Sequence, residues 1–412
     1  MKDIFYQNKQ HLILDFILFI AAFSIPFSFA FNSISIAILF FYSFVFFKKD
    51  IFISSINVKE VYVFYMLFFI MQVISIYYSC NKDVAIKSVT RNIIFFILPI
   101  TFINLKNKLD FNKIKIIYYG LLLAVLSNLI SAYFNIIRQY AFENISVKSM
   151  VREKFIANGI YDIHVPYLAL LIIFLIICTN KITYHYKERL NKGIRFLLIA
   201  FLIISLFQLS GVMSIFILGL FFIVQFLFSN KSNKIKIIGI SLMGITFILS
   251  IFWLKNSNLQ ERVKGSENLI YRAQKIIRYN DPVRNENWGS VIKVISSNVF
   301  LGVGAGGGLE LLQKERQILS EPYINKHNAH NDYLEIMLRY GLVGFGLYML
   351  LIIILIKKAF MIKNYFFIWF LVVFLISGLT ESYLQRQIGL VFFVFFSLLF
   401  YTLNQSDRTQ IN

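Results

Sequence analysis

The chain has 412 residues, of which 58% are hydrophobic and 17% aromatic, and its formal net charge is +20. A soluble domain is usually about 45–50% apolar, so the composition excludes an ordinary soluble enzyme and indicates a polytopic membrane protein. Nucleic-acid binding is a second interpretation of the charge, but membrane topology by itself requires basic loops between apolar segments. The two cysteines, Cys80 and Cys178, do not have the spacing of a zinc site.

Apolar segments recur along most of the chain, and a bilayer core needs about 20 apolar residues per helix. In chain order we predict twelve membrane-spanning helices, at residues 11–30, 33–47, 61–79, 92–104, 115–136, 163–179, 194–210, 212–229, 236–254, 341–356, 364–380 and 387–403. The first of these is also compatible with a cleaved signal peptide. We interpret it as an uncleaved span because so many others follow it.

The lysines predict the orientation of these spans. Every even-numbered connection is short and basic, as in Lys48–Lys49 and Lys357–Lys358, and basic loops remain on the cytoplasmic side. Both termini are therefore predicted inside. The one long polar connection, residues 255–339, is predicted outside, where it is long enough to form an ordered cap.

The predicted fold class is an all-α membrane protein of about 12 transmembrane helices with one large periplasmic loop that forms a small helical cap. We predict three parts. Residues 1–254 form a nine-helix transmembrane region, residues 255–339 form the periplasmic loop or cap that carries site residues, and residues 340–412 form the C-terminal transmembrane helices and a short cytoplasmic tail.

Three polar segments stand together in the long connection: "DPVRNENW" with Arg284, "NVFLGVGAGGG" at 298–308, and "HNAHNDYLE" with His327 and His330. The glycine run can cradle phosphate with backbone N–H groups. It can equally be a tight turn between two helices, with Gly302 and Gly304 at the bend.

The histidines and the arginine each allow more than one interpretation. His327 and His330, spaced i, i+3, would share a helical face and could bind a metal, although no third ligand is obvious. A histidine at a membrane boundary can be a hydrogen-bonded anchor or a general base. Arg284 can pair with Asp281 or Glu286 on the surface, or bind a pyrophosphate through two parallel hydrogen bonds.

Three longer segments resemble the O-antigen ligase and polymerase family of bacterial membrane glycosyltransferases. They are "VRNENWGSVIKVISSNVFLGVGAGG", "HNDYLEIMLRYGLVGFGLYMLL" and "LTESYLQRQIGLVFFVFFSLLF". The family pattern is Arg-x-x-x-Trp leading to a Gly-x-Gly turn, then His-Asn-x-Tyr-Leu-Glu before Gly-Leu-x-Gly, then a final helix pair with Glu-Ser. The earlier "IHVPYLALLIIF", which includes His164, is similar to the family's sixth span.

The resemblance implies a metal-independent, inverting glycosyltransferase without a cofactor, multi-pass in the bacterial inner membrane with its active site facing the periplasm. Such enzymes take a glycan from a polyprenyl (undecaprenyl) diphosphate carrier and transfer it to a sugar hydroxyl. In ligases the acceptor is lipid A–core, and in polymerases it is another glycan repeat. The implied partners are the lipid-linked oligosaccharide donor, the lipid A–core or glycan acceptor and membrane lipid, with no nucleic acid.

The resemblance also implies roles for individual residues. His330 matches the motif histidine and would act as general base on the acceptor hydroxyl or orient it, and Arg284 matches the arginine that holds the diphosphate. Further residues are predicted to bind substrate: Arg91, Gly302, Gly304, His327, Asn331, Tyr333 and His164.

One departure from the family concerns the junction of the seventh and eighth spans, where the family often has a basic residue after a serine. The junction here reads "LSGVMSIF", with Gly211 after Ser210. We predict that another outer-side cation takes this role, with Arg91 as the first choice because it lies at a helix end; Arg138, Arg152 and Lys154 are the other candidates.

We favour an O-antigen ligase-like function, with a polymerase of the same family as the alternative because both share these motifs. A non-enzymatic polysaccharide transporter would need ionisable or helix-breaking residues near the bilayer midplane, and the predicted spans are almost free of charge. A receptor or scaffold gives no reason for this order of arginine, glycine and histidine segments.

Overall fold

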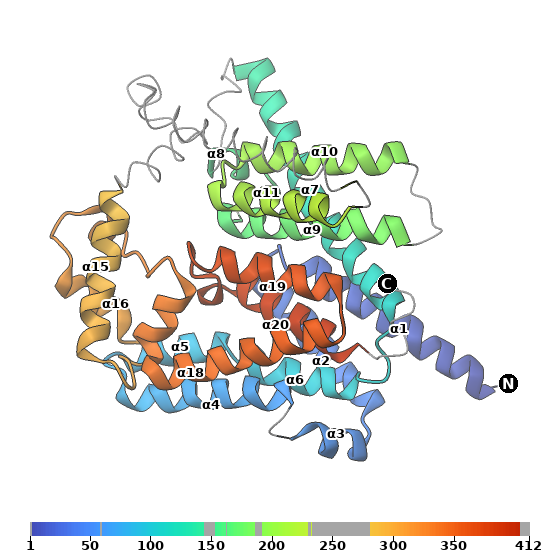
Figure 1. Ribbon diagram of the computed structural model, residues 1–412, viewed down its shortest axis with the longest axis horizontal. Coiled ribbons are helices and arrows are strands. Elements are labelled where there is room, and N and C mark those ends of the chain that lie inside the picture. Colours follow the sequence, from blue (N-terminus) through green and yellow to red (C-terminus); the bar gives the residue numbers. More distant parts are fainter. Residues whose placement is uncertain are drawn as a thin grey trace. The chain divides into compact units, whose positions relative to one another are not determined.

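The computed structural model describes residues 2–57, 60–143, 153–161, 163–185, 192–229, 232 and 281–403, and these residues form helices and connections but no strand (Figure 1). The α-helices are α1 Lys2–Ser24, α2 Phe29–Ser43, α3 Lys49–Ser55, α4 Val61–Tyr78, α5 Lys82–Arg91, α6 Ile94–Asn104, α7 Phe111–Glu143, α8 Glu153–Ile156, α9 Val165–His185, α10 Lys192–Gln208, α11 Val212–Leu227, α15 Pro282–Ser297, α16 Gly308–Glu315, α17 Glu321–Ile324, α18 Asp332–Met361, α19 Tyr365–Ser377 and α20 Gln387–Thr402. Two short 3₁₀ helices, η1 Phe44–Phe46 and η3 Tyr383–Gln385, complete the described set.

Each predicted span that falls within the described residues coincides with a helix, whereas the predicted span 236–254 lies outside them. Five helical segments there are long and apolar enough to cross a membrane: Phe29–Phe46, Val61–Tyr78, Lys82–Asn104, Phe111–Phe142 and Asp332–Met361. Shorter apolar helices are Val165–Asn180, Val212–Leu227, Tyr365–Ser377 and Gln387–Thr402. The described part of the chain is therefore all-helical, as expected for a multi-pass membrane protein, and the number of twelve spans stays a prediction.

The chain folds as two compact units, and the first comprises residues 1–124 and 283–412. Its core is the packing of α4, α6, α18, α19 and α20 (Figure 1). These helices are largely apolar in sequence, and large aromatic side chains fill space between them: Phe370 and Phe374 of α19 both stack on Phe393 of α20. Hydrogen bonds also cross this core, such as the one between the Tyr62 hydroxyl and Thr402 Oγ1 at 2.9 Å.

The second unit comprises residues 125–282, and its described helices are α8 to α11 with the C-terminal part of α7. Within it, amide side chains of α7 hold the segment that follows α8. Asn128 Oδ1 accepts a hydrogen bond from Tyr161 N at 2.9 Å, and Asn135 Nδ2 donates to Asn158 O at 2.7 Å. The unit therefore fixes its own non-helical backbone with side chains of a neighbouring helix.

The longest helix of the first unit, α18, is broken at Gly341, which has φ 59° and ψ −162°. A break leaves the first N–H groups of the following helix without intrahelical acceptors. Leu342 N and Val343 N instead donate to Val299 O at 2.8 Å and Phe300 O at 3.2 Å. The predicted span 341–356 thus begins at the break, whereas the helical segment as a whole begins at Asp332.

The segment that contains Val299 and Phe300 also supplies hydrogen-bond donors to the carbonyl groups before the break. The segment 298–307, which we call the glycine loop, connects α15 to α16. Its Val303 N and Gly304 N donate to Leu338 O and Arg339 O, each at 2.9 Å. Non-helical backbone beside a membrane span is tolerated where protein supplies its partners, and here loop and helix supply each other's.

The fit at the break predicts that Gly341→Ala destabilises the protein. A Cβ at Gly341 would lie 2.3 Å from Phe300 O, and the positive φ adds strain. We expect a loss of about 1–3 kcal/mol, measured as a lower midpoint of thermal unfolding in detergent. Gly346→Ala is the matched control in the same helix, because a Cβ there has nothing within 4 Å. Equal midpoints for the two variants would contradict the prediction.

Candidate functional site

The candidate site lies at the N-terminus of α18, where segment 327–331 leads into the helix. Asn331 determines where this helix begins. Its backbone is extended, with φ −164° and ψ 120°, and its Oδ1 accepts from Tyr333 N at 2.9 Å and Leu334 N at 3.0 Å. This is an N-cap, so the helix begins at Asp332. The prediction that His327 and His330 share a helical face is therefore wrong, because both lie before the cap in non-helical backbone.

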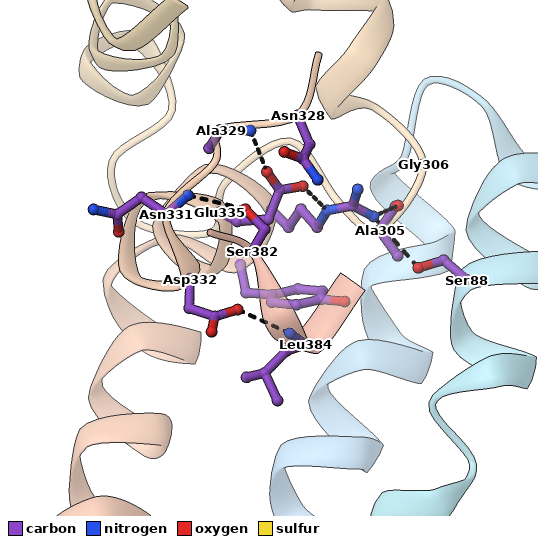
Figure 2. A network of polar contacts seen from close by, with 12 residues as sticks. Ser88, Ala305, Gly306, Asn328, Ala329, Asn331, Asp332, Glu335, Ser382 and Leu384 are labelled. Atoms are coloured by element: carbon purple, nitrogen blue, oxygen red, sulfur yellow. Dashed lines mark hydrogen bonds and ion pairs between the residues drawn. The ribbon is translucent and has the colours of Figure 1, made fainter. Parts of the chain in front are cut away.

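The turn between α19 and α20 is fixed against this helix start, as Figure 2 shows for Asn331, Asp332, Ser382 and Leu384. Asn331 N donates to Ser382 Oγ at 3.0 Å, and Leu384 N donates to Asp332 Oδ1 at 2.9 Å. Asp332 N also donates to the carbonyl oxygen of Gly378 at 2.8 Å. Segments far apart in the sequence are thereby held together by backbone and side-chain bonds.

His330 and Glu381 meet across this junction. His330 Nδ1 lies 3.1 Å from Glu381 Oε2, and the two side chains are 31% and 8% exposed. A carboxylate on Nδ1 favours the tautomer with its proton there, which leaves Nε2 free to accept a proton. Glu381 was not among the predicted site residues; the Glu-Ser pair of the third motif was the signal that could have identified it.

The backbone of His330 is in the left-handed region, with φ 46°. Such a conformation costs roughly 1–3 kcal/mol in a residue other than glycine and is found where surrounding contacts impose it. Here His330 N donates to Asn328 Oδ1 at 3.0 Å, and the flanking Ala329 N donates to Glu335 Oε2 at 2.9 Å. The histidine is therefore held in one orientation by its own chain.

His327 lies beside His330, with the two rings edge to face and their centroids 5.0 Å apart. Burial lowers the pKa of His327, and the neighbouring His330 lowers it further. Two adjacent imidazoles resist carrying two protons because like charges repel. In the described part of the chain, no group of three or more His, Cys, Asp or Glu residues is arranged to hold a metal ion.

Arg284 is connected to segment 327–331 indirectly, through the side chain of Trp288. Both lie on α15, and the Arg284 guanidinium sits over the Trp288 ring, 5.5 Å from its centroid. Trp288 Nε1 in turn donates to Ala329 O at 3.0 Å, directly before His330. The arginine and histidine motifs, more than forty positions apart, are thus joined through one indole.

A buried ion pair lies behind the segment, as Figure 2 shows around Glu335. Arg339 Nε donates to Glu335 Oε1 at 2.6 Å, and the side chains are 16% and 2% exposed. Arg339 Nη1 also donates to Ala305 O at 2.6 Å and Ser88 Oγ at 3.3 Å. Glu335 therefore connects the backbone next to His330 with the glycine loop and α5.

The glycine loop is packed tightly against its neighbours, as a turn between α15 and α16. Gly302 and Gly304 have φ 69° and 76°, and a Cβ on Gly304 would lie within contact of Ser79 Oγ. Their N–H groups donate to Asn298 O and Arg339 O. Close packing thus accounts for these glycines, and their predicted substrate-binding role stays a prediction.

The other predicted binding residues have these places. Tyr333 donates its hydroxyl to Leu375 O at 2.9 Å, which joins α18 to α19. Arg91 ends α5, where its Nη2 lies 3.4 Å from Ser88 Oγ. His164 precedes α9 in the second unit, its ring 5.8 Å from that of Tyr167. The structure therefore brings Arg284, His327, His330, Asn331 and Tyr333 around one segment, and it describes His164 only within its own unit.

The junction that lacks the expected cation also belongs to the second unit. Ser210 has φ 52° and Gly211 precedes α11, with Ser214 and Ala169 as the nearest neighbours of a Cβ there. Among the alternative cations, Arg138 lies on α7 and Lys154 on α8, and Arg152 lies outside the described residues.

Comparison with known proteins finds one family model that matches the part of the chain carrying this site. Residues 194–349 match the family model described as O-antigen ligase. No curated protein shows a match to the chain. The matched range contains Arg284, the glycine loop and His330, so this part of the chain is similar to the O-antigen ligase family, and the resemblance seen in the motifs is confirmed. The family supports a membrane glycosyltransferase of the ligase or polymerase type.

The cap geometry predicts that Asn331→Ala lowers stability, because α18 loses its N-cap acceptor. We expect a loss of about 0.5–2 kcal/mol, measured by thermal unfolding in detergent, and a smaller loss for Asn331→Ser, which keeps an acceptor oxygen. Asn325→Ala, at an exposed position just after α17, is the control. A fully stable Asn331→Ala protein would favour a binding role over the capping role.

Proposed function

We propose that the chain is an O-antigen ligase-like glycosyltransferase that moves a glycan from a polyprenyl diphosphate carrier, undecaprenyl diphosphate, to a sugar hydroxyl of lipid A–core. The observation that carries the proposal is the His330–Glu381 pair, which lies beside the segment that Trp288 contacts, with the Arg284 guanidinium over the Trp288 ring. The family match over residues 194–349 supports the same reaction class.

In the proposed reaction, the acceptor hydroxyl attacks the anomeric carbon of the donor sugar on the side opposite the diphosphate. A new carbon–oxygen bond to the acceptor forms as the bond to the diphosphate oxygen breaks, so the anomeric centre inverts. The hydroxyl proton passes to His330 Nε2, and the Glu381 carboxylate stabilises the resulting imidazolium through Nδ1–H. The carrier leaves as its diphosphate.

The leaving group gathers negative charge, and Arg284 is proposed to bind it. A guanidinium offers two parallel donors to phosphate oxygens and remains charged at any physiological pH. Stabilisation of charge that develops in the transition state is commonly a large contribution to catalysis. We also propose that Arg91 contributes the second cation, since one arginine leaves part of a diphosphate's charge uncompensated.

The setting is proposed to be the inner membrane of a bacterium, with the site facing the periplasm, where a lipid-linked donor arrives already activated. The basic short loops support this orientation. A polymerase of the same family would use the same chemistry with another glycan repeat as acceptor. The surface glycan of a deletion strain distinguishes the two, because loss of a ligase leaves unextended core with intact carrier-linked polymer.

We predict that His330→Ala abolishes transfer while the protein still inserts into the membrane. A general base contributes about 10²- to 10⁴-fold, and Glu381→Gln should lose part of this, since glutamine keeps an acceptor for Nδ1–H but not the charge. The measurement is the rate of glycan transfer in membranes that carry equal amounts of each variant. His327→Ala is the control and should lose much less; an active His330→Ala variant would refute the proposed function.

We further predict that Arg284→Lys fails nearly as severely as Arg284→Ala in the same assay. Lysine keeps the positive charge, but it has neither the planar pair of donors nor the flat face that lies over Trp288. Lys293→Ala on the exposed side of α15 is the control for loss of a positive charge. Substantial activity in Arg284→Lys would show that only the charge matters.

A further inference from the structure

Three consecutive carbonyl oxygens before His330 each accept a hydrogen bond from a side chain of a different residue. His327 O accepts from Arg316 Nη2 at 2.6 Å, Asn328 O accepts from Asn287 Nδ2 at 2.7 Å, and Ala329 O accepts from Trp288 Nε1 at 3.0 Å. Backbone outside helices and sheets must find such partners one by one. This segment is therefore held by side chains along its whole length.

Arg316 is the centre of this arrangement. Besides His327 O, its guanidinium donates to Asn287 Oδ1 at 2.5 Å, to Pro322 O at 3.0 Å and to Gln313 Oε1 at 3.3 Å. Asn287 therefore has its oxygen bound by Arg316 and its nitrogen directed to Asn328 O. Two of the three backbone contacts depend on this one guanidinium.

Arg316 is a buried charged residue that binds backbone and amide oxygens. The residue is 4% exposed, and among the described residues no carboxylate forms an ion pair with it. Its partners are carbonyl and amide oxygens, and burial lowers its pKa, with Glu286 and Glu335 opposing that effect from a distance. A buried cation is costly, and only arginine offers five donors in a rigid plane that can join several segments at once.

We propose that Arg316 is a positioning residue of the site: its buried guanidinium holds the backbone of segment 327–329 and the Asn287 amide, so that His330 is presented to Glu381. The proposal rests on the proposed function of His330. Arg316 acts through the backbone and does not touch the substrate. A misplacement of about 1 Å in a catalytic group can cost about 10²-fold in rate.

The charge of Arg316 has a second consequence, for His327. Burial and His330 lower the pKa of His327 most, and Arg316 lowers it further, whereas Glu321 and Glu381 raise it. A variant without this cation should let His327 take up a proton at higher pH.

Two variants separate geometry from charge. Arg316→Lys keeps the charge but loses the planar contacts, and Arg316→Gln loses both. We expect each to lower kcat about 10²-fold with the KM for the donor unchanged, and only Arg316→Gln to raise the pH at which His327 takes up a proton. Lys314→Gln, an exposed charge removed from α16, is the matched control and should change neither quantity.

The assay uses the full chain in proteoliposomes, with the lipid-linked glycan and lipid A–core extracted from a strain deleted for this chain, and rates are expressed per folded protein. Should the Arg316 variants fail to fold, Asn287→Asp tests the same contact, since it keeps an acceptor for Arg316 but cannot donate to Asn328 O. Its kcat should also fall.

Normal kcat in Arg316→Lys or in Asn287→Asp would overturn the positioning role, and so would a raised KM with unchanged kcat. A purely structural role would lower the yield of folded protein and leave the rate per folded molecule as it is. An active His330→Ala variant would instead remove the proposed function itself, so the two failures are distinguishable.

Discussion

The break at Gly341 is the constraint on which the first unit depends. A membrane helix that stops and starts again leaves N–H and C=O groups that lipid cannot satisfy. The glycine loop provides both kinds of partner, with Val299 O and Phe300 O on one side and two N–H groups on the other. This exchange brings the loop between α15 and α16 against the N-terminal part of α18, and it places the start of that helix, and with it His330, near α15.

His330 shows how an unfavourable conformation is held in place. Its left-handed backbone angle costs free energy, and the adjacent peptide groups offset the cost through bonds to Asn287, Trp288 and Glu335. The result is an imidazole whose direction depends on packing that is already complete before any ligand arrives. A site prepared in this way needs little rearrangement to act on a bound hydroxyl.

Much of this could be predicted from the sequence, because hydropathy determines where membrane helices form, and the motifs indicated Arg284 and His330. The break at Gly341 could not, since "RYGLVGFG" has the pattern of a continuous apolar helix and only the glycine loop supplies the alternative partners. The shared helical face of His327 and His330 was wrong because Asn331 caps the helix after them. Glu381 and Arg316 become site residues only through contacts across long stretches of sequence.

The glycine motif and the histidine motif are one structural unit, and a single helical turn joins them. Glu335 and Arg339, four positions apart on α18, form an ion pair whose carboxylate binds Ala329 N and whose guanidinium binds Ala305 O (Figure 2). Loss of one partner from a buried pair leaves an uncompensated charge, at a cost of about 3–5 kcal/mol. A change in the glycine loop can therefore alter the backbone beside His330 through Arg339 and Glu335, although the loop makes no direct contact with that backbone in this chain of interactions. The glycine loop therefore supplies hydrogen-bond partners to the break in α18 and, through Arg339 and Glu335, supports the segment that carries His330, the proposed base.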